Sequence, residues 1–357
     1  MKFDYLIGNP AYQQSRDTTK DMPVYNEFMD AAEKVADKVE LITPARFLFN
    51  AGATPKQWNE KKLNDPHFKV LQYESKSNNV FAGTDIKGGV AITYRDKDKD
   101  FGEIEIFTSY PELNGILTKL KGVRSLNTIM YPYSTYTLSE RLWEDYPEKK
   151  ARVEYIAKHR NSLSKEEKEG ELSNLRIITT NIFDLWPEIF TDIKPCDDDL
   201  EKFCCLIGRQ KGKRIYKYIK KEYIEVAENY QNYKVIVTAV NGSGKLGEVL
   251  SSPFIGEPLS GYTQTFLGIG NCKSKNEAEA IYKYICSKFC RTALGILKIT
   301  QHNPPEKWKY VPLQDFTSNS DIDWSKSIPE IDQQLYRKYG LSEEEINFIE
   351  TNVKEMN

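Results

Sequence analysis

The N-terminal part of the chain alternates between short apolar runs and amphipathic stretches, and this alternation constrains the fold more than any other feature. The apolar run 5–7 precedes a helical stretch that begins at Pro23, a residue type favoured in the first helical turn. Further strands are expected at 39–43 and 68–73, with a short helix at 56–63 between them. This order of elements predicts an α/β sheet.

Two further expectations complete this first domain. One face of the helical stretch should be buried, and it is formed by Phe28, Ala31, Ala32, Val35 and Ala36. Apolar and polar residues alternate in both 90–94 and 104–107, so these segments are expected to pair as antiparallel strands joined by the charged tip 95–100. The order suits the second half of a doubly wound sheet that finishes in an antiparallel strand.

Composition limits the classes of protein to which the chain can belong. Its 357 residues allow two domains at the usual ~100–200 residues each, and 39% hydrophobic residues suit a soluble globular protein. No apolar run is long enough to span a membrane, and no basic segment precedes an apolar stretch at the N-terminus, so a cytoplasmic protein without a membrane partner is expected. The net charge of −2 excludes a polycation, so nucleic-acid binding would need a local basic face.

The cysteines do not indicate a metal site. The six cysteines have no C-x-x-C spacing, and none of the three histidines is near a cysteine pair, so no metal is predicted. Cys286 and Cys290 are four residues apart in a helical stretch, and we expect them to be buried as small hydrophobic side chains.

The second half of the chain has a different pattern. A short helical connector at 111–121 leads into a region dominated by Tyr, Ser, Thr, Asn and Lys, in which the charged segment 165–171 is expected to be a solvated loop or helix face. Strand-like runs at 233–240 and 263–269 are separated by Gly-rich turns such as 241–244.

Helices are expected towards the C-terminus. The stretch 275–289 is amphipathic, and its apolar stripe consists of Ala278, Ile281, Tyr282, Ile285 and Phe289. The tail should form two short helices around Gly340, the second of them starting at Ser342.

The residues that follow the first strand have a distinctive chemistry. After Gly8 the chain presents an amide, a proline and an aromatic ring in Asn9, Pro10 and Tyr12. A side-chain amide oxygen and a neighbouring backbone carbonyl can accept hydrogen bonds from a flat amino-bearing ring, and an aromatic side chain can stack on it. A strand-ending turn with a satisfied asparagine is the structural alternative.

The segment Asn9-Pro10-Ala11-Tyr12 resembles the Asn-Pro-Pro-Tyr motif of the amino-methylating DNA methyltransferases, with Ala11 in place of the second proline. Segments 41–48, 78–92 and 323–341 also resemble the type II and IIG-like adenine-N6 DNA methyltransferases of restriction-modification systems. The resemblance extends along most of the chain.

The resemblance implies a site-specific enzyme that transfers a methyl group from S-adenosylmethionine to an adenine flipped out of double-stranded DNA. The Asn9 side-chain oxygen and the Pro10 carbonyl would accept the amino hydrogens, and Tyr12 would stack on the base. No covalent intermediate is required, and no proline-cysteine pair of the cytosine-C5 type is present at a strand end.

A later glycine-containing loop is expected to approach the same base or the DNA. Glycines at 83, 88 and 89 permit close backbone approach, although a plain hairpin turn explains the last two equally well. In the family an aromatic side chain of this segment covers the second face of the base. By spacing, Tyr94 is the first choice and Phe81 the second, and either can instead belong to the core.

The second half resembles the target-recognition domains of such enzymes and of type I specificity subunits, in segments 234–247, 262–265 and 297–303. The side chains expected to bind DNA are Lys87, Lys245, Gln264, Lys298, Gln301 and Asn303. Among these, the amides are suited to base edges and the lysines to phosphates, with solvated surface as the alternative. The basic cluster 211–214 is either a phosphate contact or ordinary surface.

The expected fold class is α/β, a partial doubly wound (Rossmann-like methyltransferase) sheet followed by an α+β target-recognition domain. The expected boundaries are 1–110 for the catalytic part, 111–135 for a connector, 136–320 for the recognition domain and 321–357 for a helical tail.

The cofactor-binding part of such an enzyme is not found. S-adenosylmethionine needs a Gly-containing turn after the first strand and an acidic residue after the second. The Gly-x-Gly matches 242–244 and 268–270 both lie in the expected recognition domain, and both are expected to be turns. We therefore expect a fragment, a degenerate remnant, or a split subunit completed by a missing N-terminal half or a second subunit.

Two alternatives remain open from the sequence. A non-catalytic DNA-binding specificity module would use residues 113–320 and leave Asn9 idle. A methyltransferase acting on RNA or on protein glutamine would share the Asn-Pro motif, but the large second domain argues against it. No PD-(D/E)xK-like cluster is present, so nuclease activity is not predicted.

Overall fold

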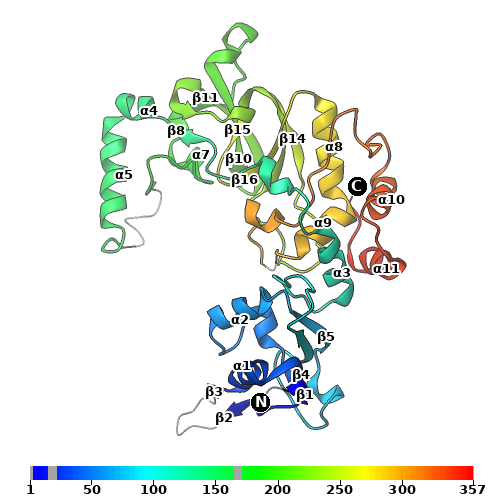
Figure 1. The fold of residues 1–357 in the computed structure, drawn as a ribbon. Helices are drawn as coiled ribbons and strands as arrows, with labels where there is room; N and C mark the ends of the chain where they lie inside the picture. The colour runs from blue at the N-terminus through cyan, green and yellow to red at the C-terminus, as the bar shows by residue number, and fades with distance from the viewer. Residues whose placement is uncertain (1–2, 15–21, 165–170, 299, 357) are drawn as a thin grey trace. The chain divides into compact units, whose positions relative to one another are not determined.

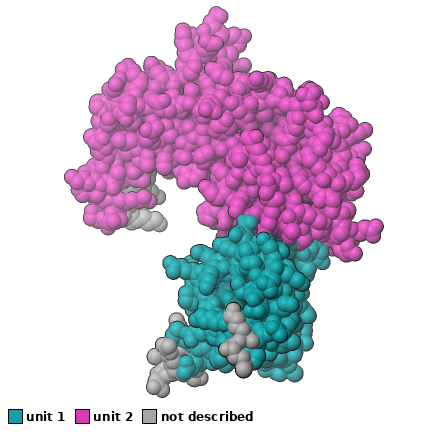
Figure 2. Space-filling view, viewed as in Figure 1, with its two compact units in different colours: residues 1–114 teal, residues 115–357 magenta. Residues whose placement is uncertain are grey.

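The computed structural model describes residues 3–14, 22–164, 171–298 and 300–356. The chain divides into two compact units, Met1–Asn114 and Gly115–Asn357, each a mixture of helices and small sheets (Figures 1 and 2). Helix α3 (Pro111–Leu120) carries the boundary between them.

The second unit includes residues 115–135 of the expected connector, the expected recognition domain and the expected helical tail, and the boundaries among these three parts stay a prediction. Ser125 of the connector donates a hydrogen bond to the Trp308 carbonyl at 2.9 Å. The Lys119 ammonium lies 2.5 Å from the Glu345 carboxylate in the tail.

The first unit is built on a four-stranded sheet with the order β1 (Phe3–Gly8), β4 (Ala36–Pro44), β6 (Val90–Asp96) and β5 (Phe68–Glu74). Strands β1 and β4 are parallel and are joined through helix α1 (Tyr25–Val35), which lies against β4. Strand β6 is antiparallel to both of its neighbours. The expected strands 5–7, 39–43 and 68–73 are confirmed, as is the helix 56–63, which is α2 (Lys56–Leu63).

The expected strand 104–107 is wrong. Both edges of β6 are already occupied, by β4 and β5, so no edge is left for it. Glu105 has a φ of 56°, which is incompatible with a strand, and its N–H donates to the Leu63 carbonyl at 2.9 Å. Phe107 instead packs edge-on against Phe49 and Tyr73.

Helix α1 buries a different face from the expected one. It begins at Tyr25, since Pro23 belongs to β3 (Met22–Pro23), a short strand that pairs with β2 (Gln13–Gln14). Its buried side chains are Tyr25, Met29 and Ala32, whereas Ala31 is exposed and Phe28 and Val35 are 47% and 39% exposed. Ala36 is buried as the first residue of β4. The Tyr25 ring contacts Phe47 and Trp58, and these contacts set the rotation of the helix.

The described residues of the second unit form three small sheets. One has the order β15 (Ser260–Tyr262), β10 (Phe203–Gln210), β11 (Lys213–Lys220) and β9 (Phe190–Thr191). Another has the order β14 (Phe254–Gly256), β13 (Tyr233–Thr238), β16 (Phe266–Cys272) and β7 (Met130–Tyr131). The third pairs β12 (Ile224–Glu225) with β8 (Thr137–Leu138). Strands β13 and β16 confirm the expected runs 233–240 and 263–269.

The helices of the second unit include α4 (Glu140–Asp145), α5 (Pro147–His159), α7 (Ile182–Leu185), α8 (Lys275–Cys286), α9 (Lys288–Gly295), α10 (Ile328–Lys338) and α11 (Glu343–Asn352). Helix α8 lies against β13, β14 and β16 (Figure 1). The two helices expected around Gly340 are confirmed as α10 and α11, and Ser342 forms a capping box with Glu345. Residues 165–170 of the charged segment lie outside the described residues.

Short 3₁₀ helices connect many of these elements: η1 (Arg46–Phe49), η2 (Ser77–Asn79), η3 (Leu126–Ile129), η4 (Pro187–Ile189), η5 (Asp197–Lys202), η6 (Lys221–Tyr223), η7 (Glu228–Gln231) and η8 (Pro305–Trp308). No described helix combines the length and the apolar character needed to cross a membrane. Among the described residues no three His, Cys, Asp or Glu side chains are grouped so that they can hold a metal ion.

The expected helix 275–289 is two helices, because the chain turns at Ser287. Ser287 has an extended ψ of 150°, and its hydroxyl accepts a hydrogen bond from the Cys290 N–H, which caps α9. Ala278, Ile281, Ile285 and Phe289 of the expected stripe are buried, and Tyr282 is partly buried. Cys286 and Cys290 are free and buried, as expected.

Candidate active site

A cleft of about 840 Å³ opens in the first unit where β1 and β4 end. Its walls include Asn9, Pro10 and Tyr12 after β1, Pro44 and Arg46 at the end of β4, and the loop residues 81 and 84–87. Because β1 and β4 are parallel, their carboxyl ends meet at one edge of the sheet, which is the usual place for a ligand in such sheets.

Asn9 and Pro10 present unused acceptors to this cleft. The Asn9 side chain is exposed, and neither its amide nor the Pro10 carbonyl has a hydrogen-bond partner among the described residues. The alternative of a turn with a satisfied asparagine therefore does not apply to the described structure. Both oxygens are available to accept hydrogen bonds from a ligand.

The position of Tyr12 is fixed by a backbone hydrogen bond, and its hydroxyl has no hydrogen-bond partner among the described residues. Its carbonyl accepts a hydrogen bond from the Val24 N–H at 3.2 Å, and the β2–β3 hairpin that follows ties the motif to the start of α1. The hydroxyl is buried and has no partner among the described residues. Burial raises the pKa of the Tyr12 phenol.

Phe81 lies in the cleft because its loop has an internal frame. The Phe81 N–H donates to the Ser77 carbonyl at 2.8 Å. The Ser77 hydroxyl donates to the Thr84 carbonyl at 3.1 Å and accepts from the Ile86 N–H at 2.8 Å. These bonds hold Phe81, Thr84 and Ile86 on the cleft wall, together with exposed Lys87.

Tyr94, the first choice from the sequence, does not line the cleft. Strand β6 runs antiparallel to β4, so that Val90 faces Pro44 at the cleft edge and Tyr94 faces Glu40 farther along the sheet. The Tyr94 ring stacks on Tyr5, and its hydroxyl donates to Asp96 at 3.0 Å. Burial and the neighbouring Asp96 raise the pKa of Tyr94 to about 12.

Arg46 is a cleft residue that the sequence did not single out. It begins η1, its side chain is exposed, and it lines the cleft with Asn9 and Tyr12. A single arginine after a strand carries no local signal of function. Only the glycines that surround it in space distinguish it, and they are Gly52, in the loop that follows η1, and Gly88, from a loop farther along the chain.

The three segments expected to recognise DNA meet at the end of β13. The Ala239 N–H donates to the Thr265 carbonyl at 2.9 Å, and the Ala239 carbonyl accepts from the Asn303 N–H at 3.0 Å. The Asn241 N–H donates to the Gln301 carbonyl at 2.7 Å. Of the expected DNA-binding side chains here, Lys245 and Gln301 are exposed and Gln264 is partly buried.

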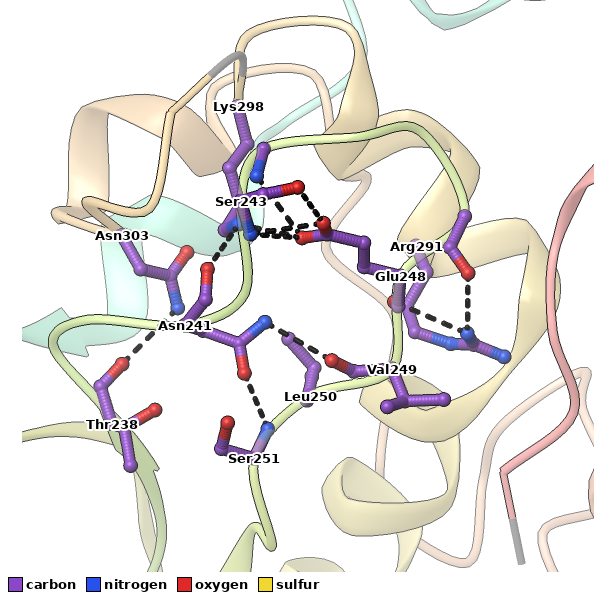
Figure 3. Close-up of polar contacts among 12 residues, drawn as sticks. Thr238, Asn241, Ser243, Glu248, Val249, Leu250, Ser251, Arg291, Lys298 and Asn303 are labelled. Atoms are coloured by element: carbon purple, nitrogen blue, oxygen red, sulfur yellow. Dashed lines mark hydrogen bonds and ion pairs between the residues drawn. The ribbon is translucent and has the colours of Figure 1, made fainter.

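Lys298 and Asn303 are internal anchors and not surface residues (Figure 3). Lys298 is 6% exposed, and its ammonium donates to the Asn241 carbonyl at 2.8 Å. Burial lowers the pKa of Lys298. The fully buried Asn303 amide donates to the Thr238 carbonyl and accepts from the Trp308 indole N–H at 3.0 Å. Their side chains hold the loop that follows β13, so neither can reach a DNA surface in this structure.

The same loop fills its own glycine turn with a carboxylate (Figure 3). Both Glu248 oxygens accept from the Ser243 N–H at 2.9 Å, and one also accepts from the Gly244 N–H at 3.1 Å. Burial raises the Glu248 pKa, but these bonds and one from the Ser243 hydroxyl outweigh burial and lower it to about 2. Segment 242–244 is therefore a turn that already holds an anion.

The other Gly-x-Gly segment, 268–270, lies in strand β16 and not in a turn. A Cβ at Gly268 would lie 2.8 Å from the Tyr262 hydroxyl, and one at Gly270 would lie 2.7 Å from Ile281 Cδ1. These glycines serve close packing. Neither Gly-x-Gly segment has room for a cofactor.

The basic cluster 211–214 comprises the turn between β10 and β11, residues 211–212, and the first two residues of β11. Lys211 and Gly212 have positive φ values of 48° and 76°, as a two-residue hairpin turn requires. The Arg214 guanidinium lies 3.5 Å from the centre of the Phe254 ring and donates to the Ser252 carbonyl. Arg214 is thus engaged within the unit, while Lys211 and Lys213 are exposed.

Residues 1–81, less than a quarter of the chain, match the family model described as Eco57I restriction-modification methylase. The matched range contains Asn9, Pro10, Tyr12, Arg46 and Phe81. No curated protein matches the chain.

Two solved structures are similar at low identity. One is the type IIL restriction-modification enzyme MmeI in complex with DNA, with a TM-score of 0.27 and 8% identity over 98% of this chain and 56% of that one. The other is the type IIG restriction endonuclease BpuSI, with a TM-score of 0.28 and 9% identity over 94% and 50%. The chain spans about half the length of these structures.

Proposed function

We propose that this chain belongs to a DNA methyltransferase of a restriction-modification system that modifies the N6 amino group of adenine. In this proposal the first unit holds an adenine extruded from double-stranded DNA, and the second unit contacts the target sequence. The observation that supports it best is that the Asn9 side-chain oxygen and the Pro10 carbonyl have no hydrogen-bond partner among the described residues and lie in the same cleft as Tyr12 and Phe81.

The residues of the cleft have the chemistry that such a base needs. The adenine amino nitrogen is a poor nucleophile because its lone pair is delocalised into the ring. When the Asn9 side-chain oxygen and the Pro10 carbonyl accept its two N–H bonds, the nitrogen moves towards a tetrahedral form and the lone pair becomes available. Stacking between Tyr12 and Phe81 offsets the cost of extruding the base, which is a few kcal/mol.

S-adenosylmethionine supplies the methyl group in such chemistry, and methylases in general use it. The two Gly-x-Gly segments do not fit this cofactor, because one binds the Glu248 carboxylate and the other is packed inside a sheet. We therefore assign to the described residues the binding of the acceptor base and not that of the methyl donor.

In the second unit, Lys245, Gln301 and Gln264 are the residues that we propose for DNA recognition, and Lys87 extends this role to the rim of the cleft. Their support is accessibility, since Lys87, Lys245 and Gln301 are exposed. The lysines suit phosphates and the glutamines suit base edges.

The test compares two single-stranded oligonucleotides, one with an ordinary adenine and one with N6,N6-dimethyladenine, which has no amino hydrogen to donate. The full chain should bind the adenine oligonucleotide about tenfold more tightly, which corresponds to ~1.4 kcal/mol for the hydrogen bonds to Asn9 and Pro10. Asn9→Ala should lose most of this preference, measured by fluorescence anisotropy. Asn64→Ala, an exposed asparagine after α2, is the matched control and should keep it.

Equal preference in Asn9→Ala and the wild-type chain would contradict the assignment of Asn9. DNA binding without any preference for the amino group would favour the alternative of a non-catalytic specificity module.

A further inference from the structure

The Arg46 side chain is held in place, yet no described residue pairs with its charge. It extends from the residue after Ala45, at the end of β4, and its guanidinium forms no hydrogen bond or ion pair with any other residue that the structure describes. A guanidinium has five N–H donors in a rigid planar fork, and it remains charged at any physiological pH. Arg46 lines the cleft and is exposed to solvent.

Two glycines fix the stem of this side chain. A Cβ at Gly88 would lie 2.4 Å from Arg46 Cγ, and one at Gly52 would lie 3.3 Å from Arg46 Cβ. Both glycines have positive φ values, +88° and +97°. The arginine stem therefore lies between two loops that approach closer than any other residue type would allow. A stem held in this way loses little conformational entropy when its head group binds a ligand.

We propose that Arg46 binds a backbone phosphate of the strand whose base occupies the cleft. This inference rests on the proposed function. A base stacked between Tyr12 and Phe81 stays attached to its sugar and phosphates, which must leave the cleft at its exposed rim. Arg46 and Lys87 are the exposed cations that line the cleft within the described residues, with Asp85 as the exposed anion beside them. The arginine fork matches two phosphate oxygens at once, which a lysine cannot do.

The experiment measures binding of two ligands to the full chain, free deoxyadenosine and a short adenine-containing single-stranded oligonucleotide. Arg46→Ala should weaken oligonucleotide binding about tenfold and leave deoxyadenosine binding within twofold of the wild-type value. The slope of log Kd against log salt concentration should fall by about 0.7, the value for one phosphate contact on a single strand. Arg46→Lys should recover only part of the affinity.

Glycine variants separate the position of Arg46 from its charge. Gly88→Ala keeps the guanidinium but displaces its stem, so it should also weaken oligonucleotide binding. Gly102→Ala is the matched control away from the cleft walls, since Gly102 has a similar φ of +76° and no neighbouring atom within 4 Å. It carries the same backbone strain and should bind both ligands as the wild-type chain does. Thermal unfolding of each variant verifies that it folds.

Equal weakening of deoxyadenosine and oligonucleotide binding in Arg46→Ala, or an unchanged salt slope, would overturn the phosphate assignment while leaving the base-binding cleft intact. Failure of the wild-type chain to bind either adenine ligand would instead overturn the proposed function, and this inference with it.

Discussion

Two aromatic side chains of similar size, Phe81 and Tyr94, lie at different places along the sheet, and for this reason we assign the stacking role to Phe81. Phe81 lies in a loop at the cleft edge, and Tyr94 lies opposite Glu40 inside the sheet. Sequence spacing cannot distinguish them, since the antiparallel direction of β6 decides which end of the segment meets the motif. For the same reason Asn9, Pro10 and Tyr12, which come directly after their strand, could be placed from local sequence, and Arg46 could not.

At Phe81 we expect a direct effect on ligand binding. Phe81→Ala should weaken binding of an adenine-containing oligonucleotide by about 1–3 kcal/mol, because stacking on one face of the base is lost. Tyr94→Ala should lower the unfolding temperature, since it removes the contacts with Tyr5 and Asp96, but leave the affinity unchanged. Anisotropy titrations and thermal unfolding of both variants check this. A larger affinity loss in Tyr94→Ala would restore it as the stacking residue.

At the scale of elements, the loop after β13 shows how distant residues define a local structure. Lysine and asparagine at positions 298 and 303 have the composition of a DNA-contacting segment, and the sequence does not reveal that Asn241, Thr238 and Trp308 bind them internally. The expected helix 275–289 is likewise two helices because a residue distant in sequence binds at the break. The Asp332 carboxylate, from α10, accepts hydrogen bonds from the Lys288 and Phe289 N–H groups at the start of α9.

The Glu248 turn should contribute to stability in a pH-dependent way. The pKa of the Glu248 carboxyl is lowered from 4.5 to about 2. Its contribution to the free energy of unfolding is therefore present above pH 4.5 and is lost as the pH falls towards 2. Glu248→Gln should reduce the free energy of unfolding at pH 7 by about 2 kcal/mol, the usual size for hydrogen bonds to a charged group, and should remove this acid dependence. Chemical denaturation across the pH range measures both effects. Glu154→Gln, an exposed glutamate on α5, should change neither.

At the scale of the whole molecule, the two units differ in how far sequence predicts them. The sheet of the first unit is made of runs close in sequence, so their periodicity was sufficient for its four strands, including the expected strand 90–94, which is β6. The second unit pairs distant segments, such as Gly268 in β16 with Tyr131 in β7, and no local pattern specifies such a pairing. Its expected class, α+β, follows because strands and helices no longer alternate along the second half of the chain. The division of its described strands into three small sheets depends on long-range packing.

The stability of the second unit should also depend on Asp332. Burial raises the pKa of this carboxyl to about 6 from an ordinary value of 3.8, although hydrogen bonds from Phe289 and Lys288 act in the opposite direction. The folded protein therefore binds the Asp332 proton more tightly than the unfolded chain does. Protonation of Asp332 stabilises the fold fully below about pH 4, and this stabilisation is lost as the pH rises through 6. Relative to Asp332→Asn, the wild-type protein should lose on the order of 2 kcal/mol of stability between pH 4 and pH 7.

Denaturant titrations of both proteins at these two pH values provide the measurement. Glu279→Gln, an exposed carboxylate variant on α8, serves as control and should follow the wild-type pH profile. An Asp332→Asn protein with the same pH profile as the wild type would show that this carboxyl does not titrate in the range.

The buried frame of the loop after β13 has a consequence for how the protein can diversify. Lys298, Asn303 and Glu248 satisfy the loop from within, so its outward side chains, such as Lys245 and Val249, carry little of the folding free energy. A combinatorial library restricted to these outward positions should yield mostly folded members, whereas one that includes the anchors should not. The loop thus has the properties of an exchangeable cassette, in which surface chemistry can vary while its supporting frame is retained.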